Sequence, residues 1–197
     1  LTTLLLSLNN LSGPIPESLG RLSNIYELRL HRNALTGSIP ASLGQLKTLG
    51  HLNLHDNQLS GSIPASLGQM TEILNIQLQN NQLTGAIPPG LFDACTKLAH
   101  LYLSNNRLSG SIPPELGQLT ALRKILLNGN LLSGPIPSSL TRLEALYAER
   151  SDFGHNALTA EGDSLLAFLH DKDPDWAETQ TVPPTHLAVT PLSSGSV

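Results

Sequence analysis

The sequence predicts an α/β repeat protein, a solenoid of short coils stacked along one axis. An Asn returns at nearly constant intervals of 24, 24, 24, 25, 24 and 26 residues. Leucines stand five and three residues before most of these Asn residues, at the period of two expected for one face of a strand. Glycine (16) and proline (14) are frequent and aromatics make up only 4%, which fits a chain that turns often.

Each coil is expected to begin with a strand whose leucines point into the stack. The Asn then turns the chain, and its amide can hydrogen-bond the backbone of neighbouring coils. The Leu-Ser/Thr-Gly-x-Ile-Pro stretch predicts a second extended segment, and Ser-Leu-Gly-x-Leu predicts one helical turn. Stacking buries the leucines that one coil cannot bury alone. The expected Asn ladder consists of Asn9, Asn33, Asn57, Asn81, Asn106, Asn130 and Asn156.

The repeat L-x-x-L-x-L-x-x-N-x-L-[ST]-G-x-I-P-x-x-L-G-x-L resembles the plant-type leucine-rich-repeat family over about residues 1–158. The resemblance implies a right-handed superhelix with a concave parallel sheet, short helical turns on the convex side, and recognition of proteins, peptides or glycans on the sheet. Plant receptors and polygalacturonase inhibitors of this family carry paired cysteines in both caps, whereas this chain has one cysteine, Cys95. A bacterial or protist surface protein therefore fits the cysteine count better.

The repeat period changes after residue 158, and we expect a C-terminal cap over 159–181. Thr159 is predicted to be the N-cap of an amphipathic helix with Leu165, Leu166, Phe168 and Leu169 on its apolar face. Residues 182–197 follow a Pro pair and alternate apolar with polar residues. They resemble the first strand of a truncated fibronectin type III domain, and the alternative is a Pro/Ser-rich linker.

The first residue falls in frame with the first strand, with no capping segment before it. We therefore expect either that a cap precedes Leu1 in a longer protein or that another subunit covers the apolar edge, which makes self-association a candidate. No apolar run reaches the roughly 18 residues needed for a membrane span. The net charge of −4 argues against nucleic acid as a partner.

Candidate binding residues are those whose side chains point away from the core of each predicted strand, or that follow it directly. In the central coils these are mainly amides and imidazoles beside one aromatic ring, a combination suited to a polar peptide or a glycan. The alternative is a solvated sheet that only keeps the chain soluble. The predicted ligand-binding residues are Arg29, His31, His51, Asn53, His55, Asn75, Gln77, Gln79, His100, Tyr102 and Lys124.

Two of these residues, His31 and His55, occupy the same position in adjacent coils and should lie about 5 Å apart. Two imidazoles are too few for an ordinary metal site, which needs three or four ligands, so no metal or other cofactor is expected. The run Asp171–Asp175 lacks the Gly and Glu of a calcium loop. We find no arrangement of nucleophile and base, and predict that the chain is not an enzyme.

The sequence therefore favours a recognition module of a larger secreted or cell-surface protein. One alternative is a structural solenoid that assembles end to end into a fibre or layer. A second alternative, suggested only by the family resemblance, is an inhibitor of a cell-wall-degrading enzyme.

Overall fold

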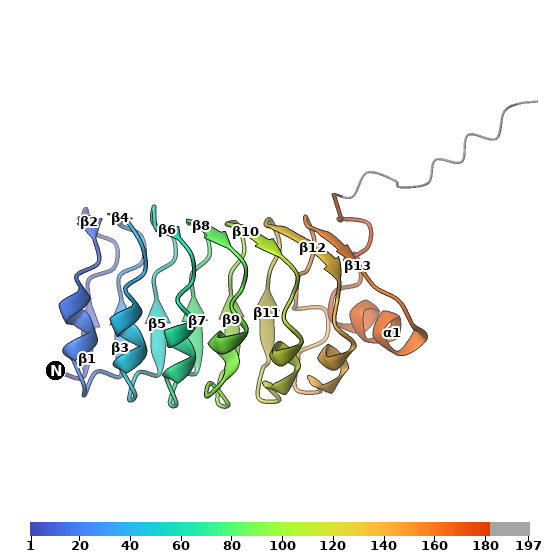
Figure 1. The fold of residues 1–197 in the computed structure, drawn as a ribbon, viewed down its shortest axis with the longest axis horizontal. Coiled ribbons are helices and arrows are strands. Elements are labelled where there is room, and N and C mark those ends of the chain that lie inside the picture. Colours follow the sequence, from blue (N-terminus) through green and yellow to red (C-terminus); the bar gives the residue numbers. More distant parts are fainter. Residues whose placement is uncertain (182–197) are drawn as a thin grey trace, which may run out of the picture.

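The computed structural model describes residues 1–181 and shows a row of coils that lie side by side (Figure 1). Each of the first six coils contributes one short strand to a parallel sheet, and the last coil adds a single bridge between Asp152 and Leu126. The middle residue of each strand points into the core, as Leu28, Leu52 and Ile76 do with 0% exposure. The strands of this sheet, in order, are β1 (Thr3–Leu5), β3 (Glu27–Arg29), β5 (His51–Asn53), β7 (Asn75–Gln77), β9 (His100–Tyr102) and β11 (Lys124–Leu126).

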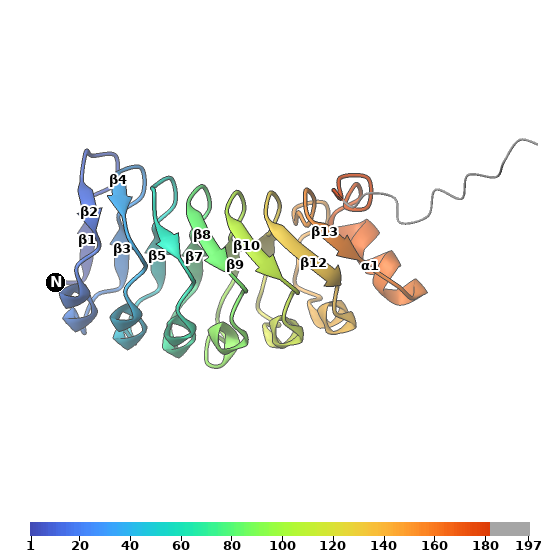
Figure 2. The same ribbon diagram turned by 45° about the horizontal axis from the view of Figure 1, so that its top comes forward.

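A second set of parallel strands forms where the Leu-Ser/Thr-Gly stretches of successive coils meet (Figure 2). The expected second extended segment is therefore present. The strands β2 (Ser12–Pro14) and β4 (Ala34–Thr36) pair with each other. A separate five-stranded sheet contains β6 (Ser60–Gly61), β8 (Gln82–Gly85), β10 (Arg107–Gly110), β12 (Leu131–Pro135) and β13 (Ala157–Thr159).

The helical turns are 3-10 helices that stack on one another from coil to coil. Glycine at the fourth position of most turns permits this stacking, because a Cβ on Gly68 would overlap the carbonyl oxygen of Gly90 in the next coil. Gly44 meets Ser66 in the same way. The turns are η1 (Glu17–Arg21), η2 (Ala41–Gln45), η3 (Ala65–Gln69), η4 (Pro89–Phe92), η5 (Pro114–Gln118) and η6 (Ser138–Arg142).

One hydrophobic core runs from the first coil to the C-terminal cap without interruption, from Ile15 to Trp176. Cys95 is fully buried in it, and its thiol lies 3.7 Å from the carbonyl oxygen of Leu67. Burial is the main reason that the pKa of this thiol rises to about 11. Cys95 is therefore a packing residue.

The Asn side chains join neighbouring coils through the backbone. Asn57 donates to the carbonyl oxygens of Leu54 in its own coil (3.0 Å) and of Leu30 in the preceding coil (3.1 Å). Its own carbonyl oxygen accepts the backbone N–H of Leu35 at 3.1 Å. The same pattern recurs at Asn33, Asn81, Asn106, Asn130 and Asn156, whereas Asn9 bonds only within its own coil.

The C-terminal helix α1 (Asp163–Lys172) packs on the last coil, but it does not begin where the sequence suggested. The prediction that Thr159 is the N-cap is wrong, because Thr159 lies in β13 and pairs with Pro135. The N-cap is Gly162, whose φ of 89° is available to glycine at little cost. Leu165 and Leu169 are buried, but Leu166 is 41% exposed and does not belong to the apolar face. The interpretation of 182–197 lies outside the described residues.

Candidate functional site

The side chains of the long sheet that point away from the core form the candidate binding surface, which we call the concave face. One row of the face follows the register Glu27↔His51↔Asn75↔His100↔Lys124, and all of these except Glu27 are predicted ligand-binding residues. A second row lies two residues further along each strand and follows the register Arg29↔Asn53↔Gln77↔Tyr102. His31, His55 and Gln79 follow the ends of β3, β5 and β7 as a third row. The structure thus places every predicted ligand-binding residue on this one face.

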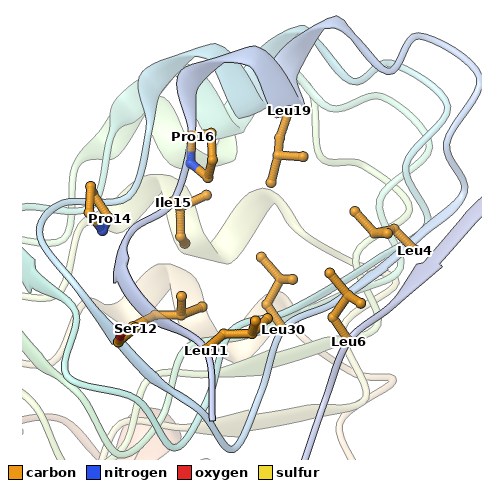
Figure 3. A pocket seen from close by; sticks show the side chains of 10 residues that line it. Leu4, Leu6, Leu11, Ser12, Pro14, Ile15, Pro16, Leu19 and Leu30 are labelled. Carbon is orange, nitrogen blue, oxygen red and sulfur yellow. The ribbon is translucent and has the colours of Figure 1, made fainter. Parts of the chain in front are cut away.

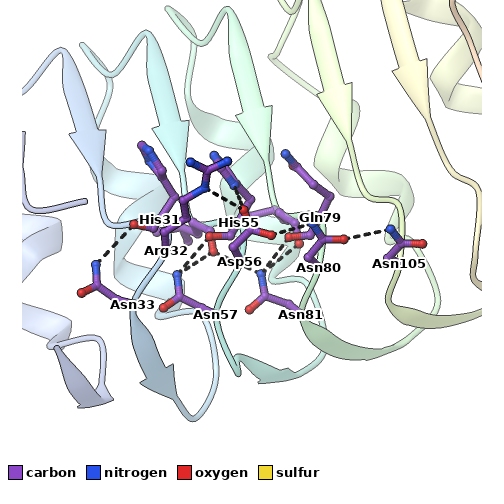
Figure 4. Close-up of polar contacts among 12 residues, drawn as sticks. His31, Arg32, Asn33, His55, Asp56, Asn57, Gln79, Asn80, Asn81 and Asn105 are labelled. Atoms are coloured by element: carbon purple, nitrogen blue, oxygen red, sulfur yellow. Dashed lines mark hydrogen bonds and ion pairs between the residues drawn. The ribbon is translucent and has the colours of Figure 1, made fainter. Parts of the chain in front are cut away.

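The third row contains a polar cluster between the second and third coils (Figure 4). The rings of His31 and His55 are stacked, with centroids 4.4 Å apart. This agrees with the distance of about 5 Å expected between the same positions of adjacent coils. His55 Nδ1 lies 2.8 Å from Asp56 Oδ2, and Arg32 Nε donates to the same oxygen at 3.4 Å. Burial is the largest cause that lowers the pKa of His31, and the nearby charges of His55, Arg29 and Arg32 lower it further.

Asp56 belongs to a second line of side-chain contacts that the sequence did not predict. Asn80 donates to Asp56 Oδ1 at 2.6 Å, and Asn105 donates to Asn80 Oδ1 at 2.8 Å (Figure 4). Burial alone would raise the pKa of Asp56, but the hydrogen bonds from Asn80 and His55 outweigh it and lower the pKa. Arg32, Asp56, Asn80 and Asn105 all have a φ between 54° and 57°. Among residues other than glycine, Asn and Asp tolerate this left-handed conformation best. The Asp and Asn residues directly before the ladder Asn could therefore have predicted the turn conformation from the sequence.

The first two rows contain further contacts between coils. Asn75 Nδ2 lies 2.8 Å from His51 Nδ1, and the His51 and Tyr26 rings form a T-shaped pair with centroids 5.3 Å apart. Glu27 accepts a hydrogen bond from Arg29 Nε at 2.6 Å. The Asn75 amide and the His51 imidazole are therefore held in place by contacts within the chain.

Several polar atoms on the concave face have no hydrogen-bond partner within residues 1–181. They are buried atoms, and they belong to residues of all three rows. An unpaired buried polar atom is costly, so these atoms mark hydrogen-bonding capacity that the chain itself does not use. These atoms are His31 Nδ1, Asn53 Oδ1, Gln79 Oε1 and His100 Nδ1.

The C-terminal end of the concave face combines rings with cations. Lys124 Nζ lies 5.6 Å from the centroid of the Tyr102 ring, and burial raises the pKa of the Tyr102 hydroxyl. Arg150 Cζ lies 5.9 Å from the centroid of the Tyr147 ring. Tyr147 was missed because the repeat pattern decays in this coil. Its separation of 24 residues from Arg123 would have identified it.

A separate apolar cavity of about 270 Å³ lies at the first coil (Figure 3). Its lining includes Leu4, Leu6, Leu11, Ile15 and Leu19. Leu6 and Leu11 are each 39% exposed, whereas the equivalent leucines of the next coils are buried. Among residues 1–181 there is no cluster of three or more His, Cys, Asp or Glu residues that could hold a metal ion, and no helix long and apolar enough to cross a membrane.

The fold and these repeats define the class of protein, and the chain belongs to the leucine-rich-repeat family. Leucine-rich-repeat models match residues 71–132 and, separately, 1–22, 24–46 and 48–70. A comparison with curated proteins gave no match.

Three solved structures illustrate the similarity. The plant peptide hormone receptor RGFR1 in complex with RGF2 shares 40% identity, with a TM-score of 0.77, over 80% of this chain and 25% of the receptor chain. The ectodomain of the Arabidopsis thaliana receptor kinase GASSHO1/SCHENGEN3, in complex with CASPARIAN STRIP INTEGRITY FACTOR 2, shares 40% identity (TM-score 0.79) over 87% of this chain and 20% of that chain. Pollen Receptor Kinase 3 shares 30% identity (TM-score 0.72), over 80% and 75%.

The chain thus spans about a quarter or less of the length of the first two receptors. These neighbours are plant proteins. The bacterial or protist origin expected from the single cysteine stays a prediction.

Proposed function

We propose that this chain is a non-catalytic recognition module that binds a protein or an extended peptide on its concave face. The observation that carries the proposal is the alignment of amide and imidazole side chains along this face, where four polar atoms have no hydrogen-bond partner within residues 1–181. An extended peptide presents an N–H and a C=O at every residue, which is the chemistry that such side chains complement.

The similar receptors support a peptide or protein ligand over the alternatives. RGFR1 and GASSHO1/SCHENGEN3 were each solved with a bound partner, RGF2 and CASPARIAN STRIP INTEGRITY FACTOR 2. By the same similarity we propose a secreted or cell-surface location for this chain. Within residues 1–181, no contact favours glycan binding or inhibition of a cell-wall-degrading enzyme over peptide binding.

The test is a selection of random linear peptides on the immobilised chain, followed by affinity measurements on variants. Replacing both Gln77 and Tyr102 with Ala should weaken the selected peptides at least about tenfold, because both side chains lie in the centre of the face. The matched control replaces exposed Gln45 and Gln118 of η2 and η5, which should leave binding unchanged. Equal affinities for the two double variants would reject the concave face as the binding site.

End-to-end assembly is a second candidate, and the apolar cavity at the first coil favours it. Leu6 and Leu11 would become buried if another molecule packed against this coil. Sedimentation of the chain at increasing concentration distinguishes the two functions. Assembly predicts a mass that rises with concentration and is lowered by Leu6→Lys, whereas a constant monomer mass rejects it.

A further inference from the structure

The imidazole of His55 is fixed on the concave face by its neighbours (Figure 4). One face of its ring stacks on His31, with centroids 4.4 Å apart, and its Nδ1 lies 2.8 Å from Asp56 Oδ2. The side chain of His55 is only 14% exposed. Its other ring nitrogen, Nε2, has no hydrogen-bond partner within residues 1–181 and is not buried, so it remains open to a ligand.

The carboxylate of Asp56 is held in one orientation by donors from both neighbouring coils. Asn80 in the next coil donates to Oδ1 at 2.6 Å, and Arg32 in the preceding coil donates to Oδ2 at 3.4 Å. Asn105, one coil further, donates to Asn80 Oδ1 at 2.8 Å. Gly129 leaves room for the Asn105 side chain, because a Cβ on Gly129 would overlap the Asn105 amide oxygen. The carboxylate therefore keeps Oδ2 turned toward His55.

The position of the His55 proton follows from the charge of Asp56. Burial would raise the pKa of Asp56, but the hydrogen bonds from Asn80 and His55 lower it overall, so this carboxyl group is ionised at neutral pH. An ionised carboxylate only accepts hydrogen bonds. Neutral His55 must therefore carry its proton on Nδ1, and its Nε2 is left as an acceptor.

Two further acceptors lie at the positions next to His55 on the concave face. Gln79 follows β7 as His55 follows β5, and Asn53 lies two residues before His55 on the same side of the strand. Gln79 Oε1 and Asn53 Oδ1 are buried and have no hydrogen-bond partner among residues 1–181. Because a buried acceptor without a donor is costly, this part of the face is suited to a ligand that brings N–H groups.

We propose that Asp56 is a positioning residue, which makes His55 Nε2 an acceptor for a backbone N–H of the peptide on the concave face. This inference rests on the proposed function. His55 Nε2, Gln79 Oε1 and Asn53 Oδ1 then form an acceptor subsite, and an extended peptide has an N–H to offer at every residue except proline. A proline of the peptide at this point cannot donate, so the subsite selects against it.

The first measurement locates the His55 proton by NMR in the full chain without a ligand. Nitrogen correlation spectra distinguish a protonated from a bare ring nitrogen, and about pH 8 lies above the ordinary imidazole pKa of about 6.5. We expect the proton on Nδ1. Asp56→Gly removes the carboxylate at a φ of 54°, which glycine adopts at little cost, and should move the proton to Nε2. A proton on Nε2 in the unmodified chain would overturn the role of Asp56.

The second measurement uses the peptides selected on the immobilised chain. Each backbone N–H of a selected peptide is replaced in turn by an ester oxygen, which removes one donor and changes the shape little. We expect one ester to weaken binding to the unmodified chain about tenfold, or about 1.4 kcal/mol, as for an acceptor left without its donor. The same ester should weaken binding to the Asp56→Gly variant less than about twofold, because His55 Nε2 no longer accepts there.

The matched control is Asn105→Gly, which removes another side chain of the same line, also at a φ of 54°, without a contact to His55. It should keep the His55 proton on Nδ1 and the tenfold effect of the ester. Equal ester effects in the Asp56→Gly and Asn105→Gly variants would overturn the proposal.

The outcomes also separate this inference from the proposed function. If the selected peptides depend on Gln77 and Tyr102 but no ester effect differs between the unmodified chain and Asp56→Gly, the recognition function stands and the acceptor subsite is wrong. If the His55 proton moves in Asp56→Gly but no peptide is captured, Asp56 positions the imidazole as proposed. The peptide function is then wrong, and so is a peptide N–H as the donor.

Discussion

The imidazole rings of His31 and His55 lie almost parallel, inclined by 14°, with centroids 4.4 Å apart. His55 Nδ1 contacts the Asp56 carboxylate, whereas His31 Nδ1 has no hydrogen bond within residues 1–181. A proton on His31 Nδ1 would therefore have no partner among the described residues. Burial and the nearby charges of His55, Arg29 and Arg32 lower the pKa of His31.

The first prediction concerns the pH dependence of this pair. The pKa of His31 is lowered in the folded chain, mainly by burial, so the unfolded chain binds the proton more tightly. The contribution of His31 to stability is therefore present above pH 6.5, its ordinary pKa, and is lost as the pH falls through its lower folded value. His31→Gln should reduce the loss of Tm between pH 7.5 and about pH 5. The control is His170→Gln, which changes an exposed residue of α1. Its Tm should fall over this pH range as much as the Tm of the unmodified chain.

The second prediction concerns the Asn ladder. Asn81→Ala removes the acceptor of the buried Leu59 N–H and the donor to the carbonyl oxygens of Leu54 and Leu78. We expect a loss of about 2–3 kcal/mol in the free energy of unfolding, because buried groups are left without partners. Asn9→Ala is the matched control. Its amide is exposed and bonds only Leu6 and Ser7, so its loss should cost under about 0.5 kcal/mol.

Urea unfolding of both variants measures this difference directly. Equal losses at Asn81 and Asn9 would mean that the bonds between coils add nothing to those within a coil.

The third prediction concerns the close stacking of the 3-10 turns. Gly68→Ala places a methyl group against the carbonyl oxygen of Gly90, which is backbone and cannot move aside alone. We expect a loss of roughly 3 kcal/mol, at the upper end of the range for overpacked sites. Gly90→Ala is the control, since the nearest atom to its new methyl group would be Ala65 Cβ at 3.3 Å. Thermal unfolding should separate the two variants by several degrees, and the reverse order would contradict the stacking explanation.

The repeat made much of the fold predictable from sequence, because each coil imposes the same short-range demands. The Leu at the centre of each strand, the turn Asn and the close-packed Gly recur with one spacing, so one correct coil predicts its neighbours. The distance between His31 and His55 followed from that spacing alone. The candidate site could be placed on the concave face for the same reason.

Where the repeat decays, local signals were insufficient. Thr159 has the side chain of an N-cap, but pairing with β12 holds it in a strand, and the helix begins four residues later at Asp163. Contacts that depend on side-chain reach were also missed. The bond from Asn80 to Asp56 and the stacking of Arg150 on Tyr147 depend on side-chain conformations that spacing does not specify.

The junction between the last coil and the cap contains a buried carboxyl group, Asp173. It is 4% exposed, and its Oδ2 accepts the backbone N–H of Phe153 at 2.7 Å. Burial, followed by the nearby carboxylates of Asp152 and Asp175, raises the pKa of Asp173 to about 7. The cap is thus joined to the solenoid through a group that favours its protonated form.

The fourth prediction follows from the sign of this shift. The folded pKa of about 7 lies above the ordinary value of 3.8, so the stabilising contribution is complete below pH 3.8 and is lost as the pH rises toward 7. Each pH unit in that range should cost about 1.4 kcal/mol. Asp173→Asn keeps an acceptor for Phe153 but carries no charge, so it should raise the Tm at pH 8 and change it little at pH 4. Asp171→Asn, which alters an exposed carboxylate paired with Lys172, should show no such dependence on pH. A Tm difference between Asp173→Asn and the unmodified chain that stays constant from pH 4 to pH 8 would show that Asp173 is charged in the folded protein throughout. In that case Asp173 would not make the attachment of the cap depend on pH.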